Sequence, residues 1–92
     1  MRVMVFLNLE GLTRDRYDQL RRVVNWEKDA PRGLILHLAS FGPRGCRLTA
    51  LWESEEDLAS YVENRLRSGI RRLGISEPTQ TEVYPLHALF AP

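Results

Sequence analysis

The feature that most constrains this chain is the order in which two hydrophobic periodicities follow one another. Apolar residues alternate with a period of two over residues 2–9, 34–41, 46–53 and 80–90, and they recur at helical spacing over 13–26 and 54–73. Alternation indicates a β-strand, and spacings of three and four indicate an amphipathic helix. The sequence therefore predicts the element order β-α-β-β-α-β.

Local capping and turn residues mark the ends of these elements. Thr13 is a suitable N-cap for the first helix, and Ser54 with an acidic residue three positions on, Asp57, is a suitable start for the second. Gly74 supplies a stop for the second helix. The segment 42–45, Gly-Pro-Arg-Gly, predicts a hairpin connection between the second and third strands, which makes those strands antiparallel neighbours.

This element order predicts an α+β, ferredoxin-like fold, in which a four-stranded antiparallel sheet carries two helices on one face. Strands two and four then lie at opposite edges. Pro85 inside the last strand, residues 80–90, agrees with an edge position or a bulge. A chain of 92 residues is long enough for one core only, so residues 1–92 form a single domain.

The helix-free face of this sheet is predicted to be apolar. We expect the purely aliphatic set of each strand to face the helices, which leaves a second apolar set on the opposite face. Large exposed apolar patches are unusual on monomers, so we expect a second copy of the chain to cover this face and form a homodimer. The predicted outward set is Met4, Phe6, Ile35, Phe41, Leu48 and Trp52.

Composition excludes several classes of protein. The net charge of +1 argues against a nucleic-acid partner, and no apolar stretch approaches the length of a membrane span, so we expect a cytoplasmic protein. Cys46 is the only cysteine, which excludes an internal disulfide and, with two histidines, a structural zinc site. An RNA-recognition motif shares the element order but needs aromatic residues where Leu48 and Ala50 stand.

Four stretches carry a resemblance to a known family: GLTRDRYDQL at 11–20, PRGLILHLASF at 31–41, LWESEEDL at 51–58 and EVYPLHALF at 82–90. Through them nearly the whole chain resembles the dimeric α+β barrel superfamily related to antibiotic-biosynthesis monooxygenases. The resemblance implies two sheets that wrap into a barrel, with a cavity beneath each sheet. It covers cofactor-free oxygenases of aromatic molecules, haem-degrading enzymes and many proteins of no known activity.

The haem-degrading branch can be tested on individual residues. When the junction at 51–58 is matched, the tryptophan and haem-ligating histidine of that branch fall at Tyr61 and Arg71. Both are replaced, which argues against haem degradation. We expect neither a cofactor nor a metal.

Three polar residues are candidates for catalysis in the implied cavity. His37 or His87 could act as a general base near neutral pH, and the amide of Asn8 could hold an oxyanion or an oxygenated intermediate. The alternatives are a core histidine with one hydrogen bond and a strand-end asparagine bonded to the following turn.

The walls of the predicted cavity are apolar, which favours a flat ligand with few oxygen functions. Trp52 could stack on such a ligand, although an aromatic residue at a strand end is also a common core residue. The chain is then either a cofactor-free oxygenase of an aromatic or polyketide-like molecule, or a non-catalytic ligand-binding or structural dimer. The predicted ligand contacts are Phe6, Phe41, Trp52 and Tyr61, and Leu48 and Ala50 complete the walls.

Overall fold

The computed structural model describes all 92 residues, and its elements follow the predicted order. The strands are β1 (Val3–Glu10), β2 (Leu34–Gly42), β3 (Gly45–Trp52) and β4 (Gln80–Pro85). The helices are α1 (Arg14–Val24), α2 (Glu55–Tyr61), the π-helical turn η1 (Val62–Leu66) and α3 (Arg67–Arg72).

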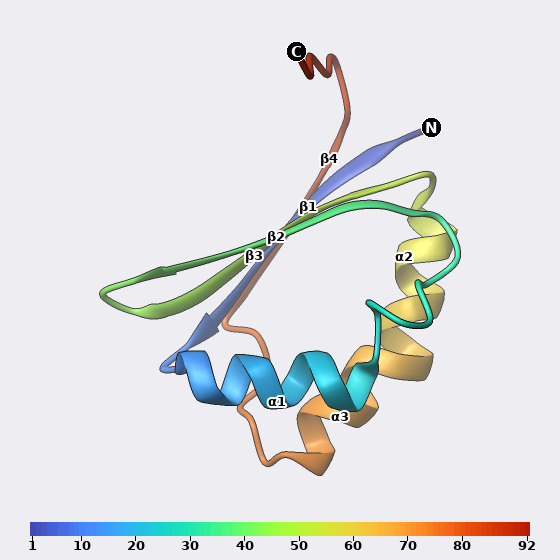
Figure 1. Cartoon of the computed structure of the whole chain (residues 1–92). Helices are drawn as coiled ribbons and strands as arrows, with labels where there is room; N and C mark the ends of the chain where they lie inside the picture. Colours follow the sequence, from blue (N-terminus) through green and yellow to red (C-terminus); the bar gives the residue numbers. More distant parts are fainter.

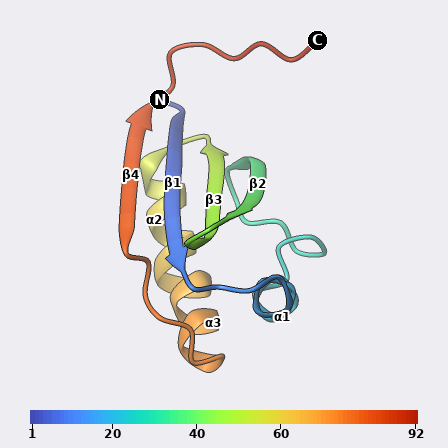
Figure 2. The same cartoon turned by 90° about the vertical axis from the view of Figure 1, so that its left-hand side faces the viewer.

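The four strands form one antiparallel sheet in the order β2-β3-β1-β4, so β2 and β4 are the edges as predicted. All helices lie on one face of this sheet (Figure 1). Figure 2 shows the strands side by side, with α2 and α3 behind them and α1 on the β2 side. The ferredoxin-like fold is therefore confirmed.

The predicted caps form the expected hydrogen bonds. Thr13 Oγ1 accepts from the backbone N–H of Arg16 at 3.2 Å, and Ser54 Oγ accepts from that of Asp57 at 3.1 Å. Each bond satisfies one of the N–H groups that a helix start leaves free. Gly74 follows α3 with a φ of 67°, the left-handed conformation that ends a helix.

The second helical segment differs from a regular α-helix in its middle. Residues Val62–Leu66 form a single π-helical turn, which joins α2 to α3 without a break. The extra residue of a π turn shifts the side chains that follow it around the helix axis. Such turns occur mostly as single insertions in α-helices, and frequently at functional sites.

The last strand is shorter than predicted. It ends at Pro85, whose ring has no N–H to offer a neighbouring strand, and only the N–H of Leu86, bonded to the carbonyl of Arg2, continues the pairing. Residues 86–92 leave the sheet beyond the N-terminus (Figure 2). The prediction of strand out to Phe90 was wrong, and the Phe90 side chain is 88% exposed.

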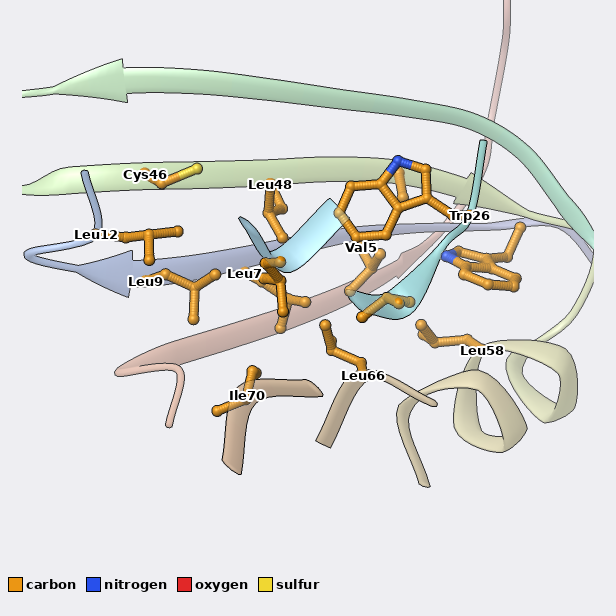
Figure 3. Packing of buried hydrophobic residues seen from close by; sticks show 14 of the residues in the cluster. Val5, Leu7, Leu9, Leu12, Trp26, Cys46, Leu48, Leu58, Leu66 and Ile70 are labelled. Atoms are coloured by element: carbon orange, nitrogen blue, oxygen red, sulfur yellow. The ribbon is translucent and has the colours of Figure 1, made fainter. Parts of the chain in front are cut away.

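The core lies between the sheet and the helices (Figure 3). Val5 and Leu7 of β1 face the helices, as predicted. Antiparallel partners share a face, and Val5 pairs with Ala50 while Leu7 pairs with Leu48. The side of β3 that carries Cys46, Leu48, Ala50 and Trp52 is therefore buried beneath the helices, and its predicted placement on the helix-free face was wrong.

The facing of β2 also differs from the prediction. A register shift between Leu34 and Leu36 interrupts the alternation, and His37 pairs with Ala50 on the helix side. Phe41 follows on the same side, whereas Leu36 and Leu38 point away from the helices. The physical cause is the bulge, which shifts the parity of the strand by one residue.

The helix-free face of the sheet nevertheless carries an apolar surface, as expected, although with different members. Leu38 is 52% exposed and Tyr84 is 50% exposed. The apolar residues of this surface are Met4, Phe6, Leu36, Leu38 and Tyr84, which we call the open-face patch. No helix in the structure has the length and apolar character needed to cross a membrane.

Candidate functional site

A small enclosed cavity lies between the sheet and the helices, and we call it the inner cavity. Its volume is about 20 Å³, which suffices for one water molecule but not for an organic ligand. Eleven of its twelve lining residues are hydrophobic. They are Val5, Leu7, Trp26, Leu34, Leu48, Ala50, Trp52, Leu58, Tyr61, Val62 and Leu66, and the twelfth is His37.

A larger groove adjoins the inner cavity, and we call it the β4 groove. It has a volume of about 320 Å³ and opens to solvent beside polar residues that include Arg67, Glu77 and Thr81. Five hydrophobic residues line both spaces: Val5, Leu7, Leu58, Val62 and Leu66. A volume of this size is within the range of small-molecule sites, and the five shared residues form the wall between the groove and the inner cavity.

The π turn contributes to both spaces. Val62 and Leu66, the first and last residues of the turn, belong to the shared wall. Tyr61, which precedes the turn, lines the inner cavity. Arg65 within the turn donates to the backbone carbonyls of Val24 at 2.7 Å and Asp29 at 2.8 Å. These bonds hold the helix against the end of α1, so the shared wall has a fixed position.

Trp52, which lines the inner cavity, carries an unpartnered hydrogen-bond donor. The residue is 2% exposed, and its indole Nε1 is buried without any acceptor. Its ring lies against that of Tyr61, with centroids 5.1 Å apart. A buried N–H without a partner costs about 1–3 kcal/mol. A ligand or water oxygen next to Nε1 would recover this free energy.

Tyr61 is a neutral phenol in this environment. Burial raises its pKa well above the usual value of a tyrosine, and the nearby charge of Arg65 offsets only part of this effect. The hydroxyl therefore keeps its proton throughout the physiological pH range. It can donate or accept a hydrogen bond but does not act as a base.

His37 is the one residue of the inner cavity with a basic side chain. Its Nε2 lies 3.2 Å from Tyr17 Oη, and its ring centroid lies 4.7 Å from that of Trp26. Burial lowers the pKa of His37, and the positive charge of Arg21 acts in the same direction, while Glu27 opposes them. The imidazole is therefore neutral at pH 7 and can accept a proton.

His37 also borders a second space, which we call the outer groove. This groove has a volume of about 360 Å³ and is lined by Tyr17, Arg21, Trp26, Glu27 and His37. Arg21 and Glu27 form an ion pair there, with Nε 2.6 Å from Oε1. The outer groove is thus lined by three aromatic rings and one ion pair.

Two predicted site residues lie on the opposite face of the sheet. Asn8 donates from Nδ2 to Gln80 Oε1 at 3.2 Å, within a polar pocket of about 590 Å³ beside the β2–β3 hairpin. Phe6 packs edge-on against Tyr84 and beneath the guanidinium of Arg47. The sheet itself separates both residues from the inner cavity, so their predicted place in one cavity with His37 was wrong.

Phe41 and His87 are also outside the inner cavity. Phe41 pairs with Cys46 at the hairpin, six residues along β3 from Trp52, which corresponds to about 20 Å. His87 is exposed in the segment that follows β4. Of the seven predicted site residues, the structure brings together His37, Trp52 and Tyr61.

Trp26 was not among the predicted site residues, because the sequence pattern marks it only as the end of the first helix. A possible signal was its size: a tryptophan at the end of an amphipathic helix needs a buried place, and the open end of a sheet–helix layer offers one. No group of three or more His, Cys, Asp or Glu side chains is placed so as to hold a metal ion.

The amino-acid sequence matches no protein-family model and no curated protein. Solved structures do match the fold. A protein of unknown function from Nitrosomonas europaea superposes with a TM-score of 0.72 at 20% identity, covering 99% of this chain and 94% of that one. A candidate antibiotic biosynthesis monooxygenase from Chloroflexus aurantiacus gives 0.67 at 12% identity, with 98% of each chain covered.

SnoaB, a cofactor-independent oxygenase from Streptomyces nogalater, is also similar, with a TM-score of 0.65 at 8% identity over 99% of this chain and 95% of that one. At these identities the likeness shows the fold alone. The chain therefore has the α+β fold of the antibiotic biosynthesis monooxygenases and their uncharacterised relatives over nearly its whole length.

Proposed function

We propose that this protein binds a small, flat, largely apolar molecule in the β4 groove, with an oxygen of the ligand in the inner cavity next to Trp52 Nε1. The observation that carries the proposal is the buried, unpartnered indole N–H of Trp52, a residue of the inner cavity that shares a wall with the β4 groove. Apolar walls favour a planar hydrophobic ligand, and one unsatisfied donor selects a single acceptor.

The size of the site supports a ligand that displaces side chains as it enters. The β4 groove offers about 320 Å³, whereas the inner cavity offers about 20 Å³. The aromatic body of the ligand occupies the groove, and its oxygen reaches the indole N–H of Trp52. Leu58 and Leu66 line both the inner cavity and the β4 groove. Small rotamer changes of these two side chains join the two spaces.

The proposed activity is the cofactor-independent oxygenation of a phenol-like ligand. It is supported by the fold relative SnoaB, which is described as a cofactor-independent oxygenase. His37 is the base of this proposal because it is neutral at pH 7 and borders the inner cavity. It takes the phenol proton and leaves an electron-rich phenolate. The ligand supplies four electrons to O₂, a ring CH₂ becomes a carbonyl, and the second oxygen atom leaves as water.

The proposed assembly is a homodimer that buries the open-face patch. Leu36, Leu38 and Tyr84 remain 43%, 52% and 50% exposed in the single chain. A net charge of +1 gives two identical copies little long-range repulsion. The second copy is therefore the occupant that this apolar surface suits.

The ligand site is tested by comparing 2-naphthol, which has one oxygen, with naphthalene, which has none. Trp52→Phe keeps an aromatic ring but removes the N–H. We expect the variant to bind 2-naphthol about fivefold more weakly, the value of one hydrogen bond of about 1 kcal/mol, while naphthalene binding changes much less. Equal losses for both ligands, or no binding of either by the unaltered protein, would refute the proposed site.

The activity is tested separately with an oxygen electrode and 1-naphthol, a two-ring phenol whose keto form has an oxidisable ring CH₂. His37→Gln should retain binding and lose most of the oxygen uptake, because a neutral amide cannot accept the proton. His87→Gln is the matched control, since His87 is exposed outside the site. Binding without any oxygen uptake would leave a ligand-binding protein and refute the catalytic role.

A further inference from the structure

Trp26 lies between the inner cavity and the outer groove. It lines both the inner cavity and the outer groove, as does His37, and its side chain is 7% exposed. In Figure 3 its indole lies among the core side chains beside Val5 and Leu48, both of which also line the inner cavity. The Trp26 and His37 rings together form the partition between the two spaces.

The backbone that carries Trp26 is held on both sides. Asn25, in the left-handed conformation with φ of 64°, donates to the carbonyl of Arg21 at 2.8 Å and accepts from the N–H of Asp29 at 3.0 Å. Arg65 donates to the carbonyls of Val24 and Asp29. These bonds fix the turn relative to α1 and η1, so the indole is a fixed wall and not a mobile flap.

The side chains around the indole restrict it further. Its ring centroid lies 4.7 Å from that of His37 and 6.0 Å from that of Tyr17. Tyr17 itself contacts Phe41 edge-on, with centroids 5.9 Å apart. A tryptophan in such a cluster has little room for another rotamer, because each neighbour is itself packed.

We propose that Trp26 is the specificity-determining residue that limits how far a ligand extends inward, an inference that rests on the proposed ligand site. With the indole in place, the site ends at the inner cavity. Without it, the inner cavity and the outer groove of about 360 Å³ become one continuous space. Molecules that extend beyond the bound oxygen then fit, with their far end among Tyr17 and the Arg21–Glu27 pair.

The partition can be tested without any ligand. Trp26→Phe and Trp26→Ala each leave Trp52 as the sole tryptophan, so fluorescence reports on that residue alone. Phenylalanine keeps an aromatic plug, and alanine removes it. We expect acrylamide to quench Trp52 at least twofold more effectively in Trp26→Ala than in Trp26→Phe, at equal helix content by circular dichroism. Equal quenching in two folded variants would overturn the proposal, and Trp26→Leu replaces the alanine variant if that one does not fold.

The effect on specificity is measured with 2-naphthol and with 2-benzyloxynaphthalene, whose benzyl group extends beyond the oxygen that faces Trp52. We expect Trp26→Leu to raise the affinity for the longer molecule about tenfold relative to the shorter one. Arg21→Leu is the matched control, because Arg21 borders the outer groove but not the inner cavity, and it should leave the ratio unchanged. An unchanged ratio in Trp26→Leu would overturn the inference while the proposed site stands.

The outcomes separate the two proposals. If 2-naphthol binds none of these proteins, the proposed ligand site fails, and the role of Trp26 in specificity fails with it, whatever the quenching shows. If 2-naphthol binds and the ratio shifts only in Trp26→Leu, both are supported. If the ratio shifts equally in Arg21→Leu, the outer groove already belongs to the site and Trp26 is not its limit.

Discussion

The open-face patch offers the most direct test of the proposed assembly, and the substitution we choose is Leu38→Lys. Leu38 lies on β2, an edge strand, with 52% of its surface exposed in the single chain. Complete burial of a leucine is worth about 1.5–3 kcal/mol, so burial of the exposed half contributes about 1 kcal/mol. A symmetric dimer contains the residue twice, which brings the lost burial to about 2 kcal/mol.

This loss corresponds to a dissociation constant raised about thirtyfold, since each 1.4 kcal/mol is tenfold. The lysine ammonium adds a desolvation cost in the same direction unless it reaches solvent at the rim. Asn64→Lys is the matched control, because it adds the same charge on an exposed residue of η1, away from the sheet.

The measurement is sedimentation equilibrium from about 1 to 100 µM, a range typical of protein–protein dissociation constants. We expect dimers of the unaltered protein and of Asn64→Lys, and a marked shift toward monomer for Leu38→Lys. A monomeric unaltered protein throughout this range would refute the proposed assembly. A Leu38→Lys variant as dimeric as the control would show that the open-face patch is not the contact surface.

Three further predictions concern stability. Ser54→Ala removes the cap to the N–H of Asp57 and should cost about 1 kcal/mol in the free energy of unfolding, measured with urea; no change would contradict the importance of this cap. Lowering the pH from about 8 to about 5 should reduce the free energy of unfolding less in His37→Gln than in the unaltered protein. Burial lowers the pKa of His37 in the folded state, so the unfolded state binds more protons as the pH falls through the ordinary pKa of a histidine. Equal pH profiles would argue against a buried neutral imidazole. Gly45→Ala should cost more than Gly74→Ala in thermal melts, since both have positive φ but only at Gly45 would a Cβ meet backbone atoms, at 2.5 Å; equal losses would refute this reading of the hairpin.

The local signals of the sequence were sufficient for the element order. Thr13 and Ser54 cap helices because their hydroxyls satisfy N–H groups within three residues, an interaction that needs no tertiary contact. Pro85 ends β4 on an edge because its ring has no N–H. The ferredoxin-like arrangement then follows from the order of elements and from short connections.

It was harder to predict which side of each strand faces the helices, and the signal available in the polar residues of β3 was only partly used. Arg47 and Thr49 share one side of β3, and the cost of burying a charge directs that side away from the helices. This observation alone would have placed Leu48 and Trp52 in the core. In β2 both sides are apolar, so alternation cannot decide which of them faces the helices.

What the sequence by itself determined is the set of elements, their caps and the presence of apolar residues on both faces of the sheet. The tertiary structure decided which three predicted site residues meet, because a bulge in β2 turns His37 toward the helices and the register of β3 places Trp52 across from Val3. It also placed Trp26 beside His37, although ten residues lie between them in the sequence. Such contacts depend on register and strand order, which arise from packing across the whole core and not from any local pattern.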